Sequence, residues 1–155
     1  MLYFISPLLN IKSLEKWDVS NGNNFSSMFY KCKLLSDISS LEKWDISNGN
    51  IFSYIFYGCS SLKDIKSLKN WNVSNCNNFS FMLYKCTSLS DISSFEKWNI
   101  SKDNNFSYMF YYCSSLSDIS SLKNWNISNE INFNECPSSS EFRLKPYNFS
   151  YMLYG

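Results

Sequence analysis

Hydrophobic and polar positions along this chain follow a pattern that returns every 27 residues. Tryptophan marks the period most clearly, because each tryptophan stands 27 positions after the one before it (44 − 17 = 27). The five are Trp17, Trp44, Trp71, Trp98 and Trp125. A column of cysteines keeps the same spacing: Cys32, Cys59, Cys86 and Cys113. A fixed period of this length is the signature of a repeat architecture, in which each unit buries its apolar face against its neighbours. We therefore expect both sets to stack in columns that form the structural core.

Each unit divides into two segments with different patterns. In NNFSYMFYYC, at 104–113, apolar residues fall at i, i+3, i+4 and i+7 from Phe106 to Cys113, which is typical of a short amphipathic helix with an asparagine near its N-cap. The following segment, SLSDISSLKNWNIS at 115–128, separates Leu, Ile and Trp by Ser, Asp and Asn, which favours turns and a short strand. The predicted fold is an α/β repeat solenoid with one short strand and one short helix per 27-residue unit.

The repeat extends over nearly the whole chain, so we expect a single solenoid domain over 1–155. Residues 1–16 align without a gap with the second half of a unit, and further units begin near each tryptophan. The register breaks at about 134–147, where two prolines predict an irregular loop, and 148–155 opens another unit. The apolar run at the start is too short to span a bilayer and lacks the features of a signal peptide.

The repeated phrase itself points to a family. It reads W-[DN]-[VI]-S-N, then N-F-S-x-M-F-x-x-C-x-S-L, and it resembles the BspA-like leucine-rich repeats carried by many surface proteins of bacteria and protists. The resemblance covers the chain from Met1 to about Phe133. It implies a leucine-rich-repeat-like solenoid, a role in binding or adhesion, and a location at the cell surface or outside the cell.

The composition removes most catalytic chemistry. The chain has no histidine, which is the commonest general base, the partner of serine and cysteine nucleophiles, and a usual zinc ligand. We therefore expect no enzyme activity, no cofactor and no metal. Fourteen Lys and Arg against thirteen Asp and Glu leave a net charge of +1 without a basic block. Nucleic acid is accordingly not an expected partner.

Two columns leave a chemical alternative open. The cysteine column favours buried free thiols over zinc, because zinc needs four ligands that converge on one point and a column places its thiols in a line. Cys76 and Cys136 lie outside that column. Stacked aspartates can bind cations such as Ca²⁺, but the S-D-I context favours aspartates that accept a backbone N–H in a turn. These aspartates are Asp37, Asp64, Asp91 and Asp118.

Further periodic polar positions predict surface structure. The position two residues before each tryptophan is charged and predicts a ladder in which Lys69 lies between Glu42 and Glu96. Its members are Glu15, Glu42, Lys69, Glu96 and Lys123. The asparagines of N-x-[ST] sequons are interpreted mainly as residues that cap or bond the backbone. They are Asn24, Asn72, Asn78, Asn99, Asn105, Asn126 and Asn148.

The segment expected to be helical carries aromatic residues on the side that should be polar. At i and i+3 these residues share one face, and they predict a tyrosine-rich band along the outside of the solenoid. They are Tyr30, Tyr54, Tyr57, Phe81, Tyr84, Tyr108 and Tyr111. Partial burial between neighbouring units and a docking surface are both open interpretations. A second candidate surface, on the strand side, contains Glu42, Asp45, Lys69 and Asn72.

Together these patterns favour a non-enzymatic interaction module that binds protein or glycan, as a surface or adhesion protein or as part of a longer repeat array. The alternative is a structural repeat protein without a dedicated ligand, whose unburied ends promote end-to-end self-association. The compartment stays open between the cell surface, which the resemblance favours, and the interior of the cell.

Overall fold

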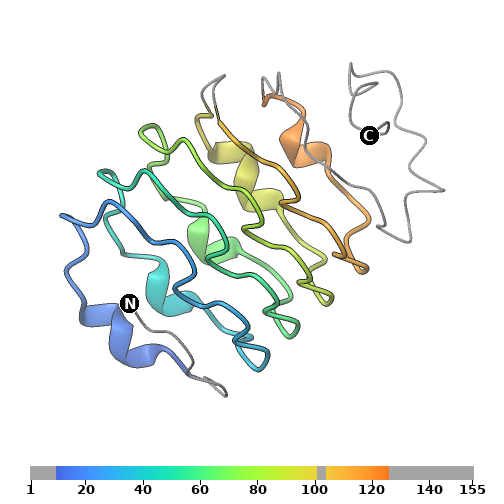
Figure 1. The fold of residues 1–155 in the computed structure, drawn as a ribbon, viewed down its shortest axis with the longest axis horizontal. Helices are drawn as coiled ribbons and strands as arrows, with labels where there is room; N and C mark the ends of the chain where they lie inside the picture. Colours follow the sequence, from blue (N-terminus) through green and yellow to red (C-terminus); the bar gives the residue numbers. More distant parts are fainter. Residues whose placement is uncertain (1–9, 101–103, 126–155) are drawn as a thin grey trace.

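The computed structural model describes residues 10–100 and 104–125, and over these residues the chain winds into a stack of similar coils (Figure 1). Each coil contributes one short 3-10 helix, and these helices lie along one side of the stack (Figure 1). Each of these helices contacts only the helices before and after it in the chain, as expected for a stack in which each repeat touches only its neighbours. They are η1 (Lys12–Lys16), η2 (Ser39–Leu41), η3 (Lys66–Leu68), η4 (Ser93–Lys97) and η5 (Ser120–Leu122).

The predicted α/β repeat solenoid is wrong. The described residues contain no α-helix and no β-strand, only the 3-10 helices, turns and isolated parallel bridges such as Asn24 to Ile51 and Ile51 to Asn78. Where the helix was expected, the chain forms consecutive turns. In the first of these segments the N–H groups of Met28, Tyr30 and Cys32 each donate to the carbonyl three residues back, at 3.4, 3.1 and 3.1 Å.

Hydrogen bonds between coils explain why no helix forms. The N–H groups of alternate residues donate to carbonyls of the next coil: Phe25 to Ile51 at 2.9 Å, Ser27 to Ser53 at 3.0 Å, and Phe29 to Ile55 at 2.9 Å. An α-helix would need these same N–H groups for its own bonds from residue i to residue i−4. Because they are committed to the neighbouring coil, only the intervening N–H groups remain for bonds within the segment.

The expected strand is replaced by an Asx turn and a 3-10 helix. The Asp118 carboxylate accepts the Ser120 N–H at 2.8 Å, and η5 begins at that serine. Asp37 and Asp91 make the same bond to Ser39 and Ser93. A side-chain acceptor two residues before a backbone donor closes a tight turn, so the chain bends here and does not extend.

Identical residues meet in columns through the interior. The rings of Phe25 and Phe52 stack at 5.0 Å between centroids, and those of Phe79 and Phe106 at 5.4 Å. Four tryptophans are buried, and each indole N–H donates to a backbone carbonyl of the preceding coil. The bonds run from Trp44 to Leu14, from Trp71 to Leu41 and from Trp98 to Leu68, each at 2.9 Å, and from Trp125 to Phe95 at 3.1 Å. The prediction that all five tryptophans lie in the core is wrong for Trp17, which is 47% exposed. The tryptophan column therefore combines packing with a polar bond across every coil boundary.

We predict that Trp71→Phe lowers the free energy of unfolding by about 2–4 kcal/mol, because it shrinks a buried ring and removes one of the two hydrogen bonds to the Leu41 carbonyl. Trp17→Phe is the matched control, and its exposed position predicts a change below about 0.5 kcal/mol. Urea denaturation of both variants measures the difference. Equal losses would show that burial in the column is not what makes these tryptophans stabilising.

Candidate binding surface

The aromatic residues of the predicted band lie together on the surface as two stacked columns. The first joins Tyr30 to Tyr57, Tyr57 to Tyr84 and Tyr84 to Tyr111, with ring centroids 4.7, 4.6 and 5.3 Å apart. The second joins Tyr54 to Phe81 and Phe81 to Tyr108, at 4.7 and 4.9 Å. The two columns contact each other within each coil, at 5.6–5.8 Å between centroids. We call these seven residues the aromatic band.

The band presents ring edges to solvent. Tyr57 stacks against Tyr30 on one face and Tyr84 on the other, with interplanar angles of 20° and 5°. Phe81 is covered in the same way by Tyr54 and Tyr108. These residues are nevertheless only half-buried, and Tyr108 is 38% exposed. Since neighbouring rings occupy the faces, the exposed part of each inner ring is its edge.

Two residues of each coil beneath the band have a left-handed backbone conformation. Tyr54, Phe81 and Tyr108 have φ angles of 60°, 57° and 57°, and a second left-handed position follows four residues later, at Gly58, Lys85 and Tyr112. Side chains with a Cβ pay roughly 1–2 kcal/mol for this conformation, which glycine adopts freely. Only Gly58 among these positions avoids that cost.

Two lysines lie over the rings of the first column. The Lys31 ammonium is 5.0 Å from the Tyr30 ring centroid, and that of Lys85 is 5.4 Å from Tyr84 and 5.0 Å from Tyr112. Cation–π contacts of this kind are favourable at distances below about 6 Å. Burial, followed by the neighbouring tyrosines, raises the pKa of Tyr57, so its hydroxyl stays protonated and remains a hydrogen-bond donor at neutral pH.

The second predicted surface is less continuous than the aromatic band, because two of its four side chains bond the backbone. Glu42, Asp45, Lys69 and Asn72 are all exposed, but Asp45 and Asn72 accept backbone N–H groups of Ser47 and Ser74 in Asx turns. The predicted placement of Lys69 between two glutamates gives no ion pair in the described residues. Two glutamates of the ladder form ion pairs with other lysines: Glu15 with Lys43, at 3.6 Å, and Glu96 with Lys123, at 3.8 Å.

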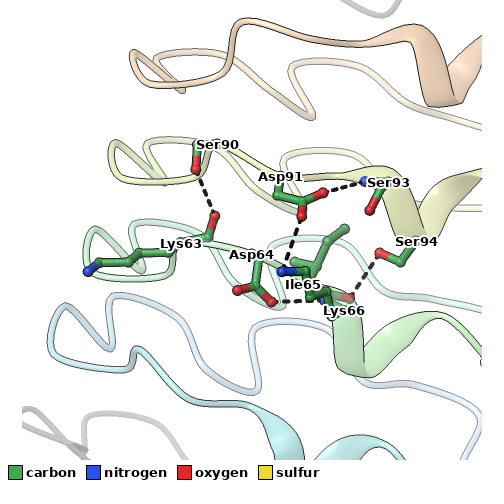
Figure 2. Close-up of polar contacts among 8 residues, drawn as sticks. All are labelled: Lys63, Asp64, Ile65, Lys66, Ser90, Asp91, Ser93 and Ser94. Atoms are coloured by element: carbon green, nitrogen blue, oxygen red, sulfur yellow. Dashed lines mark hydrogen bonds and ion pairs between the residues drawn. The ribbon is translucent and has the colours of Figure 1, made fainter.

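The aspartate column serves the turns. Asp64 and Asp91 lie on adjacent coils (Figure 2), and their backbones form an isolated parallel β-bridge. The Asp91 carboxylate accepts the Ser93 N–H at 2.9 Å and forms an ion pair with the Lys66 ammonium at 3.4 Å. Both partners lower the pKa of Asp91, and the hydrogen bonds to Ser93 are the larger cause. Among residues 10–100 and 104–125, no group of three or more Asp, Glu, Cys or His side chains is arranged to hold a metal.

Asparagine performs the same turn-forming task as aspartate elsewhere in the repeat. The side-chain oxygens of Asn24, Asn78 and Asn105 accept the N–H groups of the serines two residues on, at 2.9, 3.0 and 2.9 Å. The acceptor oxygen, common to both residue types, is therefore the property that these positions use. Asn126 and Asn148 lie outside the described residues.

The cysteines lie in the core and bond the backbone. The thiols of Cys59, Cys86 and Cys113 donate to the carbonyls of Phe29, Phe56 and Leu83 in the preceding coil, at 3.2, 3.2 and 3.1 Å. Cys32 and Cys76 are also buried and free, and Cys76 donates to the Gly49 carbonyl at 3.2 Å. Cys136 lies outside the described residues. Burial raises the pKa of Cys32, Cys59, Cys76 and Cys86, which disfavours the thiolate that nucleophilic or metal chemistry needs.

We predict that the buried thiols react very slowly with a disulfide reagent in the folded protein. The pKa of Cys76 is raised to about 12, which lowers its thiolate fraction at pH 8 roughly a thousandfold. In a Cys136→Ser background, we expect the remaining thiols to stay unmodified for hours in buffer and to react within minutes in concentrated urea. Rapid modification without denaturant would contradict the buried cysteine column.

We also predict that Asp91→Ala lowers the free energy of unfolding by about 1 kcal/mol, whereas Asp91→Asn costs less than half of that, since the amide oxygen can keep the bond to Ser93. The lowered pKa of Asp91 means that its carboxylate adds stability above the pKa of the unfolded chain and loses this contribution as the pH falls through the folded-state pKa. Denaturation at pH 7 and below pH 4 measures both effects. A cation-binding role would instead appear as equal losses for both variants that depend on added Ca²⁺.

In the described residues, no helix has the length and apolar character needed to cross a membrane. Comparison with curated proteins gives no match, and comparison with solved structures gives none either. One family, described as "Mycoplasma protein of unknown function, DUF285", matches residues 39–146, which is 108 of the 155 residues (146 − 39 + 1 = 108). The chain therefore belongs to the DUF285 family of Mycoplasma proteins of unknown function.

Proposed function

We propose that this chain is a non-enzymatic interaction module that binds a protein or glycan partner through the aromatic band. The observation that carries the proposal is the continuous pair of stacked columns, from Tyr30 to Tyr111 and from Tyr54 to Tyr108, half-buried and open to solvent along its ring edges. Tyrosine-rich, partly apolar surfaces of this kind are enriched at protein interfaces.

The repeat fixes the backbone under the band but does not require an aromatic residue there. Tyr54, Phe81 and Tyr108 occupy left-handed positions, where glycine would avoid the steric cost, and Ser27 holds the equivalent position of the first coil with a φ of 60°. Aromatic stacking contributes about 0.5–1.5 kcal/mol per pair and offsets part of that cost. A band that served stability alone would gain more by burying its rings completely, because buried apolar area is what stabilises.

The resemblance of the repeat to the BspA-like leucine-rich repeats supports a role at a cell surface or in adhesion. In such a setting a solenoid-like stack presents an extended surface, along which a partner can contact several repeats at once. End-to-end self-association is the alternative, and it predicts sedimentation that depends on protein concentration and is unaffected by substitutions in the band.

We predict that Tyr57→Ser/Tyr84→Ser weakens partner binding at least tenfold, because two central rings of an interface are removed. The measurement is binding to arrays of glycans and of proteins. Glu42→Ser/Lys69→Ser is the control, since it changes two residues of the other candidate surface without changing the net charge. Tyr108→Ser, at the most exposed ring of the band, separates loss of binding from loss of folding.

Unchanged binding by both the double tyrosine variant and Tyr108→Ser, with the fold verified by circular dichroism, would remove the band from consideration. Weakened binding by the control alone would transfer the function to the surface around Glu42 and Lys69.

A further inference from the structure

A group of lysines borders the aromatic band. Lys31 and Lys85 lie over the rings of the first column, and Lys33 and Lys63 follow at positions just beyond the band in their own coils. All four are exposed. The Ser61 N–H donates to the Lys33 carbonyl at 3.2 Å, so the segments that carry Lys33 and Lys63 run side by side on adjacent coils. We call these four residues the lysine edge.

The four lysines of this edge form no ion pair among the described residues. The ion pairs there use Lys43, Lys66 and Lys123. The segments that carry these lysines, 30–36, 57–63 and 84–90, contain no aspartate or glutamate. An aspartate directly follows each segment, and the carboxylates of these residues, Asp37, Asp64 and Asp91, accept backbone N–H groups in turns. Figure 2 shows the Lys63 side chain extending away from Asp64, the nearest acidic residue in the chain. The positive charge of this edge is therefore available to a partner.

The ring geometry narrows the class of partner. Sugars and nucleic-acid bases bind aromatic residues by stacking on ring faces, and the faces of Tyr57, Tyr84 and Phe81 are covered by their neighbours at 4.6–5.3 Å. What remains exposed is the ring edge, which carries partial positive charge, and tyrosine hydroxyls, which donate hydrogen bonds. Ring edges, hydroxyl groups and lysine ammonium groups all favour anionic oxygen atoms.

We infer that the aromatic band and the lysine edge together bind an acidic, extended segment of a partner protein. The inference rests on the proposed function and names the partner class for the same surface. A carboxylate-bearing peptide supplies the anionic oxygens, and its apolar methylene groups and backbone can lie along the ring edges. The first column spans about 15 Å from Tyr30 to Tyr111, which about five extended residues cover at roughly 3.3 Å each.

The test compares two carboxylate polymers that differ in backbone. Poly-L-glutamate represents the acidic peptide and polygalacturonate represents an acidic glycan, and binding to the full chain is measured by calorimetry at 50 and 300 mM salt. We expect poly-L-glutamate to bind more tightly, with an affinity that falls at the higher salt concentration. Equal or tighter binding of polygalacturonate would overturn the assignment of a protein partner.

Variants locate the binding site. Lys31→Gln/Lys85→Gln should weaken binding of poly-L-glutamate roughly fivefold. Lys16→Gln/Lys97→Gln, at exposed lysines just before Trp17 and Trp98, removes the same charge and should leave the affinity unchanged. Equal weakening by both pairs would show only non-specific attraction to a positive protein and would overturn the inference.

The outcomes for the inference and for the proposed function are distinguishable. If the array partner is lost in Tyr57→Ser/Tyr84→Ser but retained in Lys31→Gln/Lys85→Gln, the band binds a partner that is not acidic, and only the inference fails. If the tyrosine variants retain all array binding, the proposed function itself fails. A further check is Tyr57→Phe/Tyr84→Phe, which keeps the rings and should weaken poly-L-glutamate binding by about twofold to fivefold through loss of two hydroxyl donors.

Discussion

Backbone hydrogen bonds between adjacent coils are the constraint on which this structure depends. At alternate residues, from Phe25 to Phe29 and in the equivalent segments, the N–H donates to the next coil. The intervening N–H groups then bond three residues back, which produces consecutive turns and recurrent left-handed residues. The same bonds hold residues one repeat apart against each other. The stacked columns therefore follow from the alternation of backbone N–H groups that bond the next coil with N–H groups that close turns within the same coil.

Much of the polar chemistry of the repeat serves this stacking. Tryptophan indoles and cysteine thiols donate to carbonyls of the preceding coil, and aspartates and asparagines accept N–H groups within turns. The carbonyls that these indoles and thiols reach, such as those of Leu14 and Phe29, each also accept a backbone N–H of their own coil. The side-chain bond is therefore a second hydrogen bond to the carbonyl, and it links two coils. Residue types that suggest catalysis or metal binding thus bond the backbone, whereas the surface that we propose for a partner consists of aromatic and lysine side chains.

Two properties of the band suit the binding role that we propose. Stacking of Tyr57 between Tyr30 and Tyr84 holds the rings rigidly, so little side-chain entropy remains to be lost when a partner docks. The stacking also covers the ring faces, and this selects which chemistry the surface can recognise. Membership of the DUF285 family does not itself supply a function.

The sequence by itself determined the period, the residues that form the core columns except Trp17, which is exposed, and the positions of the aromatic band, because residues one repeat apart must occupy equivalent places in any regular stack. It did not determine the local backbone. The spacing of Phe25, Phe29 and Cys32 places them on one face of a helix, but the same residues also point inward in a series of turns. Only the tertiary structure decided between the two, since the deciding partners, such as Ile51 and Ile55, lie a whole repeat away. The same long-range contacts decided that the ring faces are covered and that the ladder glutamates pair with lysines other than Lys69.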